Sequence, residues 1–66
     1  MKIDKLRIEV ILAEQGTTKA ALAARCGFTP QNLYTIIRRG TCEPKTAGKI
    51  AAGLGVIVSD IIAKEA

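Results

Sequence analysis

The chain has 66 residues, of which 48% are hydrophobic but only 3% aromatic, and a formal net charge of +4 at pH 7. This length provides one small domain with an aliphatic core, and it is too short to enclose the pocket that an enzyme needs. No run approaches the ~20 apolar residues of a membrane-spanning helix. Because the N-terminus also lacks the apolar stretch of a signal peptide, we expect a cytoplasmic protein.

The first helix is predicted from about Asp4 to Gln15, with Asp4 as its N-cap and Gly16 at its end. Its apolar side chains recur at the i, i+3, i+4 spacing of a core-facing stripe, at Ile8, Ile11 and Leu12. We therefore expect this helix to serve the core and to carry no chemistry.

Two short helices separated by a tight turn are predicted next. Thr17 or Thr18 is suited to cap the first of them, and Gly27 supplies the positive φ that ends it. Thr29 followed by Pro30 is a start signal for the second. The inward stripe of that second helix consists of Leu33, Ile36 and Ile37.

The outward face of the helix that begins at Pro30 carries amides, hydroxyls and a phenol, whereas an ordinary solvated face carries Glu and Lys. No acidic residue occurs from Pro30 to Thr41. Amides and hydroxyls read base edges in the major groove of DNA, and acids would be repelled by the phosphates. A polar surface without a partner stays open as an alternative. The candidate base-reading residues are Pro30, Gln31, Asn32, Tyr34 and Thr35.

Positive charge is concentrated in the middle of the chain. Between residues 16 and 50 there are six basic residues and one acid, whereas the two flanks together carry four bases and five acids. Basic side chains that contact phosphates give affinity without sequence information. The candidate phosphate contacts are Thr18, Lys19, Thr29, Arg38, Arg39 and Lys45.

A further helix is predicted from about Pro44 to Gly53, ended by Gly55. Gly48 and Gly53 each weaken it by about 1 kcal/mol relative to Ala, so tertiary packing must hold it.

The last segment, residues 56–62, alternates like a strand when read alone. Its short length and the capping residues Ser59 and Asp60 favour a short fifth helix. Ile57 lies outside the core pattern, and we expect a dimer contact at Ile57 and Ile61.

The chain resembles the phage-repressor family of helix-turn-helix proteins (the Cro and CI-repressor type, also called the XRE family). The family's usual spacing of a polar residue, Leu-Ala and a later Gly is matched by Thr18, Lys19, Leu22, Ala23, Gly27, Thr29 and Leu33. The likeness continues through Gly40-x-x-x-Pro44 and Ile50-Ala51-x-x-Leu54-Gly55-Val56, so it covers nearly the whole chain. It implies an all-α, five-helix, lambda-repressor-like domain over residues 1–66, with the helix-turn-helix at helices 2 and 3.

The resemblance also implies a function. Proteins of this type are sequence-specific regulators that bind double-stranded DNA. We expect a homodimeric repressor from a prokaryote or a mobile element, which inserts helix 3 into the major groove of a palindromic operator.

Two departures from the family pattern stand out. Many relatives carry an Arg at the position of Leu12 and a Glu at the position of Ile37, and these form an ion pair; here we expect an apolar contact instead. In addition, the interval from Leu33 to Gly40 is one residue longer than usual, so the helix end or the loop must absorb an insertion.

Catalysis, cofactors and metals are not expected. The chain has no histidine and no serine except Ser59, and Cys26 and Cys42 are expected to be reduced thiols. The alternative function is a protein-interaction module, such as an antitoxin with secondary DNA binding, whose partner would be a toxin or an anti-repressor. Antitoxins of this type usually add a toxin-gripping segment, and because the sequence ends at Ala66 we expect a stand-alone regulator.

Overall fold

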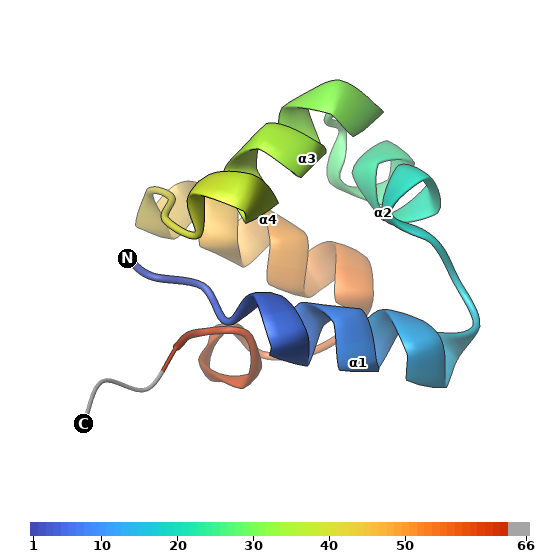
Figure 1. Cartoon of the computed structure of the whole chain (residues 1–66), viewed down its shortest axis with the longest axis horizontal. Helices are drawn as coiled ribbons and strands as arrows, with labels where there is room; N and C mark the ends of the chain where they lie inside the picture. The colour runs from blue at the N-terminus through green and yellow to red at the C-terminus, as the bar shows by residue number, and fades with distance from the viewer. Residues whose placement is uncertain (64–66) are drawn as a thin grey trace.

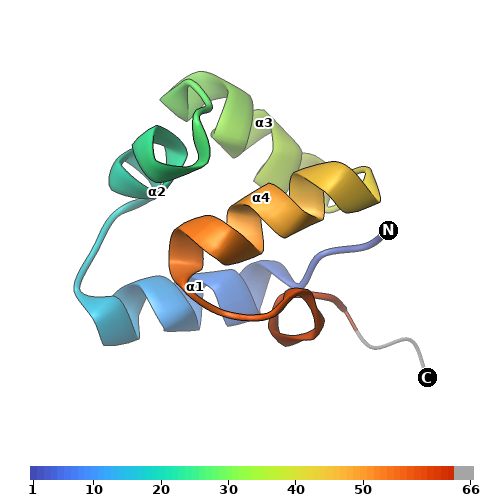
Figure 2. The ribbon, with the colours of Figure 1, turned by 180° about the vertical axis from the view of Figure 1, so that it is seen from behind.

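In a computed structural model, which describes residues 1–63, the chain forms four α-helices and one 3₁₀ turn. The helices are α1 (Lys5–Gln15), α2 (Lys19–Cys26), α3 (Pro30–Arg39) and α4 (Pro44–Leu54), and the turn is η1 (Val58–Asp60). Helices α2 and α3 meet at a corner on one side of the molecule, and α1 runs along the other side (Figure 1). Helix α4 lies behind them in Figure 1 and in front of them in the reverse view of Figure 2.

The helix starts are set by local hydrogen bonds. The carboxylate of Asp4 accepts from the N–H of Arg7 at 3.0 Å. The hydroxyl oxygens of Thr18 and Thr29 accept from the N–H three residues later, at 3.2 and 3.1 Å. Thr18, and not Thr17, is therefore the cap of α2. Each of these caps satisfies a backbone donor that the first turn of a helix leaves without a partner.

The expected fifth helix is not confirmed as an α-helix, because the segment after α4 forms only the three-residue 3₁₀ turn η1. Ile57 is extended, and beyond η1 the chain pairs with the N-terminal segment, where the N–H of Asp4 donates to the carbonyl of Ile61 at 2.7 Å. An isolated bridge between Ile3 and Ile62 continues this pairing. The backbone groups that would extend a helix are thus engaged with residues nearly 60 positions earlier.

The same N-terminal segment also holds the end of α3. The N–H of Ile3 donates to the carbonyl of Gly40 at 2.9 Å, and the ammonium of Lys5 donates to the carbonyl of Arg38 at 2.8 Å. The negative end of the helix dipole stabilises a cation placed at the helix C-terminus. Helix α3 continues to Arg39 and ends at Gly40, so the extra residue of the interval before Gly40 lies in the helix and not in the loop.

The core is aliphatic and draws on every element. The largest completely buried side chains are Ile8 of α1, Leu22 of α2, Leu33 of α3, Ile50 of α4 and Ile61 after η1. Leu12 and Ile37, between which we expected an apolar contact, are both buried in this core. Ile61 has no exposed surface, so it stabilises the fold and cannot contact a second copy as we expected.

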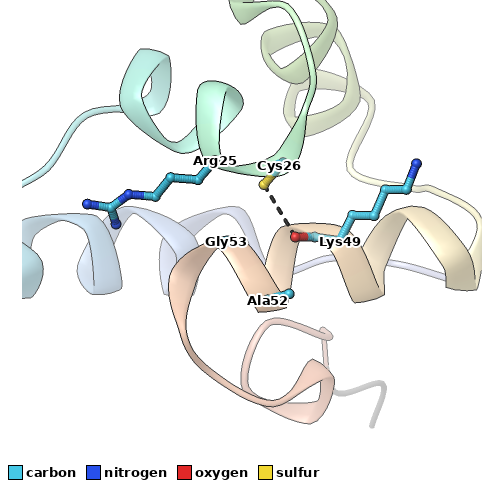
Figure 3. Close-up of a pocket in the computed structure, with 5 residues that line it drawn as sticks. All are labelled: Arg25, Cys26, Lys49, Ala52 and Gly53. Carbon is cyan, nitrogen blue, oxygen red and sulfur yellow. Dashed lines mark hydrogen bonds between the residues drawn. The ribbon is translucent and has the colours of Figure 1, made fainter.

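Helices α2 and α4 approach closely at a glycine. Figure 3 shows Gly53 of α4 beside Cys26 of α2, whose Sγ donates to the carbonyl of Lys49 at 3.3 Å. A Cβ at Gly53 would lie 2.5 Å from this sulfur and 3.1 Å from Cδ1 of Leu22. The absence of a side chain at this position therefore sets how α2 sits on α4.

Candidate nucleic-acid interface

Helix α3 presents one apolar and one polar face. Leu33 and Ile37 are buried, whereas Gln31, Asn32 and Tyr34 are exposed. Because Leu33 and Ile37 pack α3 against the core, the polar side chains on its opposite face point outward from a fixed helix. The exposed polar surface of α3 thus carries the amides and the phenol that the sequence marked as candidates for base reading.

Two further base-reading candidates differ from these three. Pro30 is exposed at the first position of α3, where it has no N–H to donate. Thr35 is half-buried, and its hydroxyl donates to the carbonyl of Gln31 at 3.0 Å. With this proton engaged in its own helix, Thr35 offers a methyl group and an acceptor, but no free donor.

The capping threonines retain a donor. Thr18 and Thr29 are exposed, and each uses an oxygen lone pair to accept from the backbone. A hydroxyl carries one proton in addition to its two acceptor sites. The proton of each therefore stays available for a phosphate oxygen at the N-terminus of α2 or α3.

The basic candidates lie in the first or last turns of α2, α3 and α4. Arg38 and Arg39 are exposed in the last turn of α3, and Lys45 is exposed in the first turn of α4. Lys19, at the start of α2, lines a shallow groove together with Tyr34, Ile37 and Arg38 of α3. The fold therefore brings Lys19 and Arg38 together, although 18 residues separate them in the sequence.

Two residues near this face were missed by the sequence reasoning, and both come from α1. Lys5 holds the C-terminal end of α3, as described above. Glu9 forms an ion pair with Lys19, with 2.5 Å between Nζ and Oε1. Neither contact has a sequence signal, because no spacing rule links partners that far apart on different elements.

Exposed apolar side chains occur away from α3. Ile57 is 66% exposed in the connection that follows α4, and Leu6 is 73% exposed on the outer side of α1. Of the two residues expected at a dimer contact, only Ile57 is thus available to a partner.

The cysteines lie outside the polar face. Cys26 and Cys42 are separate thiols, and burial raises the pKa of each above its ordinary value, so both are neutral near pH 7. Over residues 1–63, no cluster of three or more His, Cys, Asp or Glu side chains has a metal-binding arrangement. None of the helices in this range has the length and apolar character needed to cross a bilayer.

Comparison with known protein families gives a match over most of the chain. The family model described as Cro/C1-type HTH DNA-binding domain matches residues 7–66. Neither the curated proteins nor the solved structures include a significant match to the chain.

Proposed function

Because the chain belongs to the Cro/C1-type HTH DNA-binding family and is thus a DNA-binding regulator, we propose that it acts as a homodimeric repressor on a palindromic operator. In this proposal α3 enters the major groove. The observation that carries it is the outward face of α3, where exposed amides and a phenol occur without any acid.

Base reading is assigned to Gln31, Asn32 and Tyr34. An amide side chain pairs bidentately with adenine, and a phenol adds a single hydrogen bond. Pro30 and the methyl of Thr35 add apolar contacts of the kind that a thymine methyl accepts. These five residues would supply sequence discrimination and not the bulk of the affinity.

Affinity is assigned to the groups around this face. Arg38 and Arg39 lie in the last turn of α3, and the arginine fork suits phosphate oxygens. Thr18 and Thr29 would donate their free hydroxyl protons, and Lys19 and Lys45 would add charge. Such contacts release counterions, so binding should weaken steeply as salt rises.

The dimer is assigned to the surface around Ile57. One recognition helix touches only a few base pairs, whereas a two-fold dimer reads two half-sites about 10 base pairs apart. Two-fold symmetry places the same patch on both copies, and an exposed aliphatic side chain suits a self-complementary contact.

The first experiment is selection of binding sites from random DNA duplexes at about 150 mM salt, where non-specific contacts are screened. We expect an enriched palindrome, and Gln31→Ala should relax the preference at one position in each half-site. Ser59→Ala, on η1, is the matched control and should leave the preference unchanged. Binding without an enriched sequence would refute base reading by α3 and would direct attention to a protein partner, as expected for an antitoxin.

The dimer is tested by sedimentation equilibrium. Ile57→Asp should shift the wild-type dimer toward monomer, and Leu6→Asp should not, although Leu6 is equally apolar and more exposed. Dissociation by Leu6→Asp alone would move the interface to α1 and refute the assignment to Ile57.

A further inference from the structure

The ion pair between Glu9 and Lys19 joins α1 to the start of α2. The side chain of Lys19 is 35% exposed and that of Glu9 is 51% exposed, so both groups remain in contact with solvent. In the part of the chain that the structure describes, the side chains of Arg38, Arg39 and Lys45 form no ion pair. Of the four basic candidates for phosphate contact, Lys19 is the one that forms an ion pair within residues 1–63.

The position of this pair gives it a bearing on DNA binding. Lys19 lines the same groove as Tyr34 and Arg38, so its side chain borders the polar face of α3. Glu9 belongs to α1, whose buried side chains serve the core, yet its carboxylate reaches Lys19. Glu9 thus places a negative charge next to Lys19 at the start of α2.

We propose that Glu9 sets the DNA affinity of this protein by competing with a phosphate for Lys19. This inference rests on the proposed use of α2 and α3 at the DNA. A carboxylate and a phosphate are alternative acceptors for the same ammonium, so the pair must break or be shared when DNA binds. Glu9 would then lie within a Debye length of the backbone, about 8 Å at physiological salt, and would be repelled by it.

The consequence is a lower non-specific affinity. An ammonium that is already neutralised releases fewer counterions on binding, so Lys19 contributes less to sequence-independent attraction. Base contacts made by α3 are unaffected by this competition. Because a backbone phosphate is present at every site, Glu9 lowers specific and non-specific affinity alike and leaves the sequence preference unchanged.

The test compares Glu9→Gln with Glu14→Gln. Both variants lose one negative charge from an exposed position of α1, but only Glu9 is paired with Lys19. Binding to a labelled random-sequence duplex is followed by fluorescence anisotropy between about 50 and 200 mM salt. Glu9→Gln should bind about three- to five-fold more tightly at the lowest salt, and the slope of log K against log salt should steepen by up to about 0.9. Glu14→Gln should change the affinity by less than about two-fold and leave the slope unchanged.

Lys19→Gln identifies the group through which Glu9 acts. It should weaken binding little in the wild-type background, and in the Glu9→Gln background it should abolish the gain. Equal effects of Glu9→Gln and Glu14→Gln would overturn the inference while leaving the proposed function intact. Equal losses from Lys19→Gln in both backgrounds would overturn it as well. Failure of the wild-type protein to bind any duplex would instead refute the proposed function, and this inference with it.

Discussion

The two glycines inside α4 should respond oppositely to the same substitution. In a helix interior, Ala is favoured over Gly by about 0.8–1.0 kcal/mol. At Gly48 an added Cβ meets no atom within 4 Å, so Gly48→Ala should gain this full amount. For a domain of this size the gain corresponds to a rise in Tm of about 4–8 °C.

At Gly53 the same methyl group would collide with α2. It would lie 2.5 Å from Sγ of Cys26 and 3.1 Å from Cδ1 of Leu22. The sulfur is held by its hydrogen bond to the carbonyl of Lys49 (Figure 3). Leu22 is completely buried, so neither neighbour moves freely. Overpacking typically costs about 1–3 kcal/mol. Because this cost equals or exceeds the gain in propensity, Gly53→Ala should lower the stability by up to about 2 kcal/mol.

The assay is urea unfolding followed by circular dichroism at one fixed protein concentration, since dimer formation would otherwise shift the apparent stability. The double variant Cys26→Ala/Gly53→Ala removes the colliding sulfur. It should be more stable than the sum of the two single changes predicts, because contacting residues couple. Stabilisation by Gly53→Ala equal to that by Gly48→Ala would refute the close approach of α2 and α4.

Two further predictions concern the core and the thiols. Leu12→Arg and Ile37→Glu should each lower the free energy of unfolding by about 3–5 kcal/mol, because each buries an unpaired charge. The double variant should recover part of this loss, since the two charges can then pair. If urea unfolding shows no recovery in the double variant, the two positions do not face each other. Burial raises the thiol pKa values of Cys26 and Cys42 in the folded chain, so as the pH rises the unfolded chain loses these protons at a lower pH than the folded chain does. The free energy of unfolding should therefore fall as the pH rises above about 8.5. Unfolding at pH 7 and pH 9.5 should show a smaller fall in a variant with Ser at both positions, and an identical fall would contradict the assignment.

The sequence by itself determined the four α-helices and where the first three of them begin, to within one residue. The caps at Asp4, Thr18 and Thr29 bond to groups three residues away, so the information lies within one helical turn. The polar face of α3 follows from helical periodicity in the same way, because Leu33 and Ile37 lie on one side and the amides on the other.

Only the tertiary structure decided which segments far apart in the sequence contact one another. The last segment has capping residues suited to a helix, but pairing of Ile3 with Ile62 and of Asp4 with Ile61 limits it to one turn and buries Ile61. The pairing of Lys19 with Glu9 likewise depends on how α1 lies against α2. Local spacing rules act over three or four residues, whereas these contacts are fixed only when the core closes and brings separate elements together.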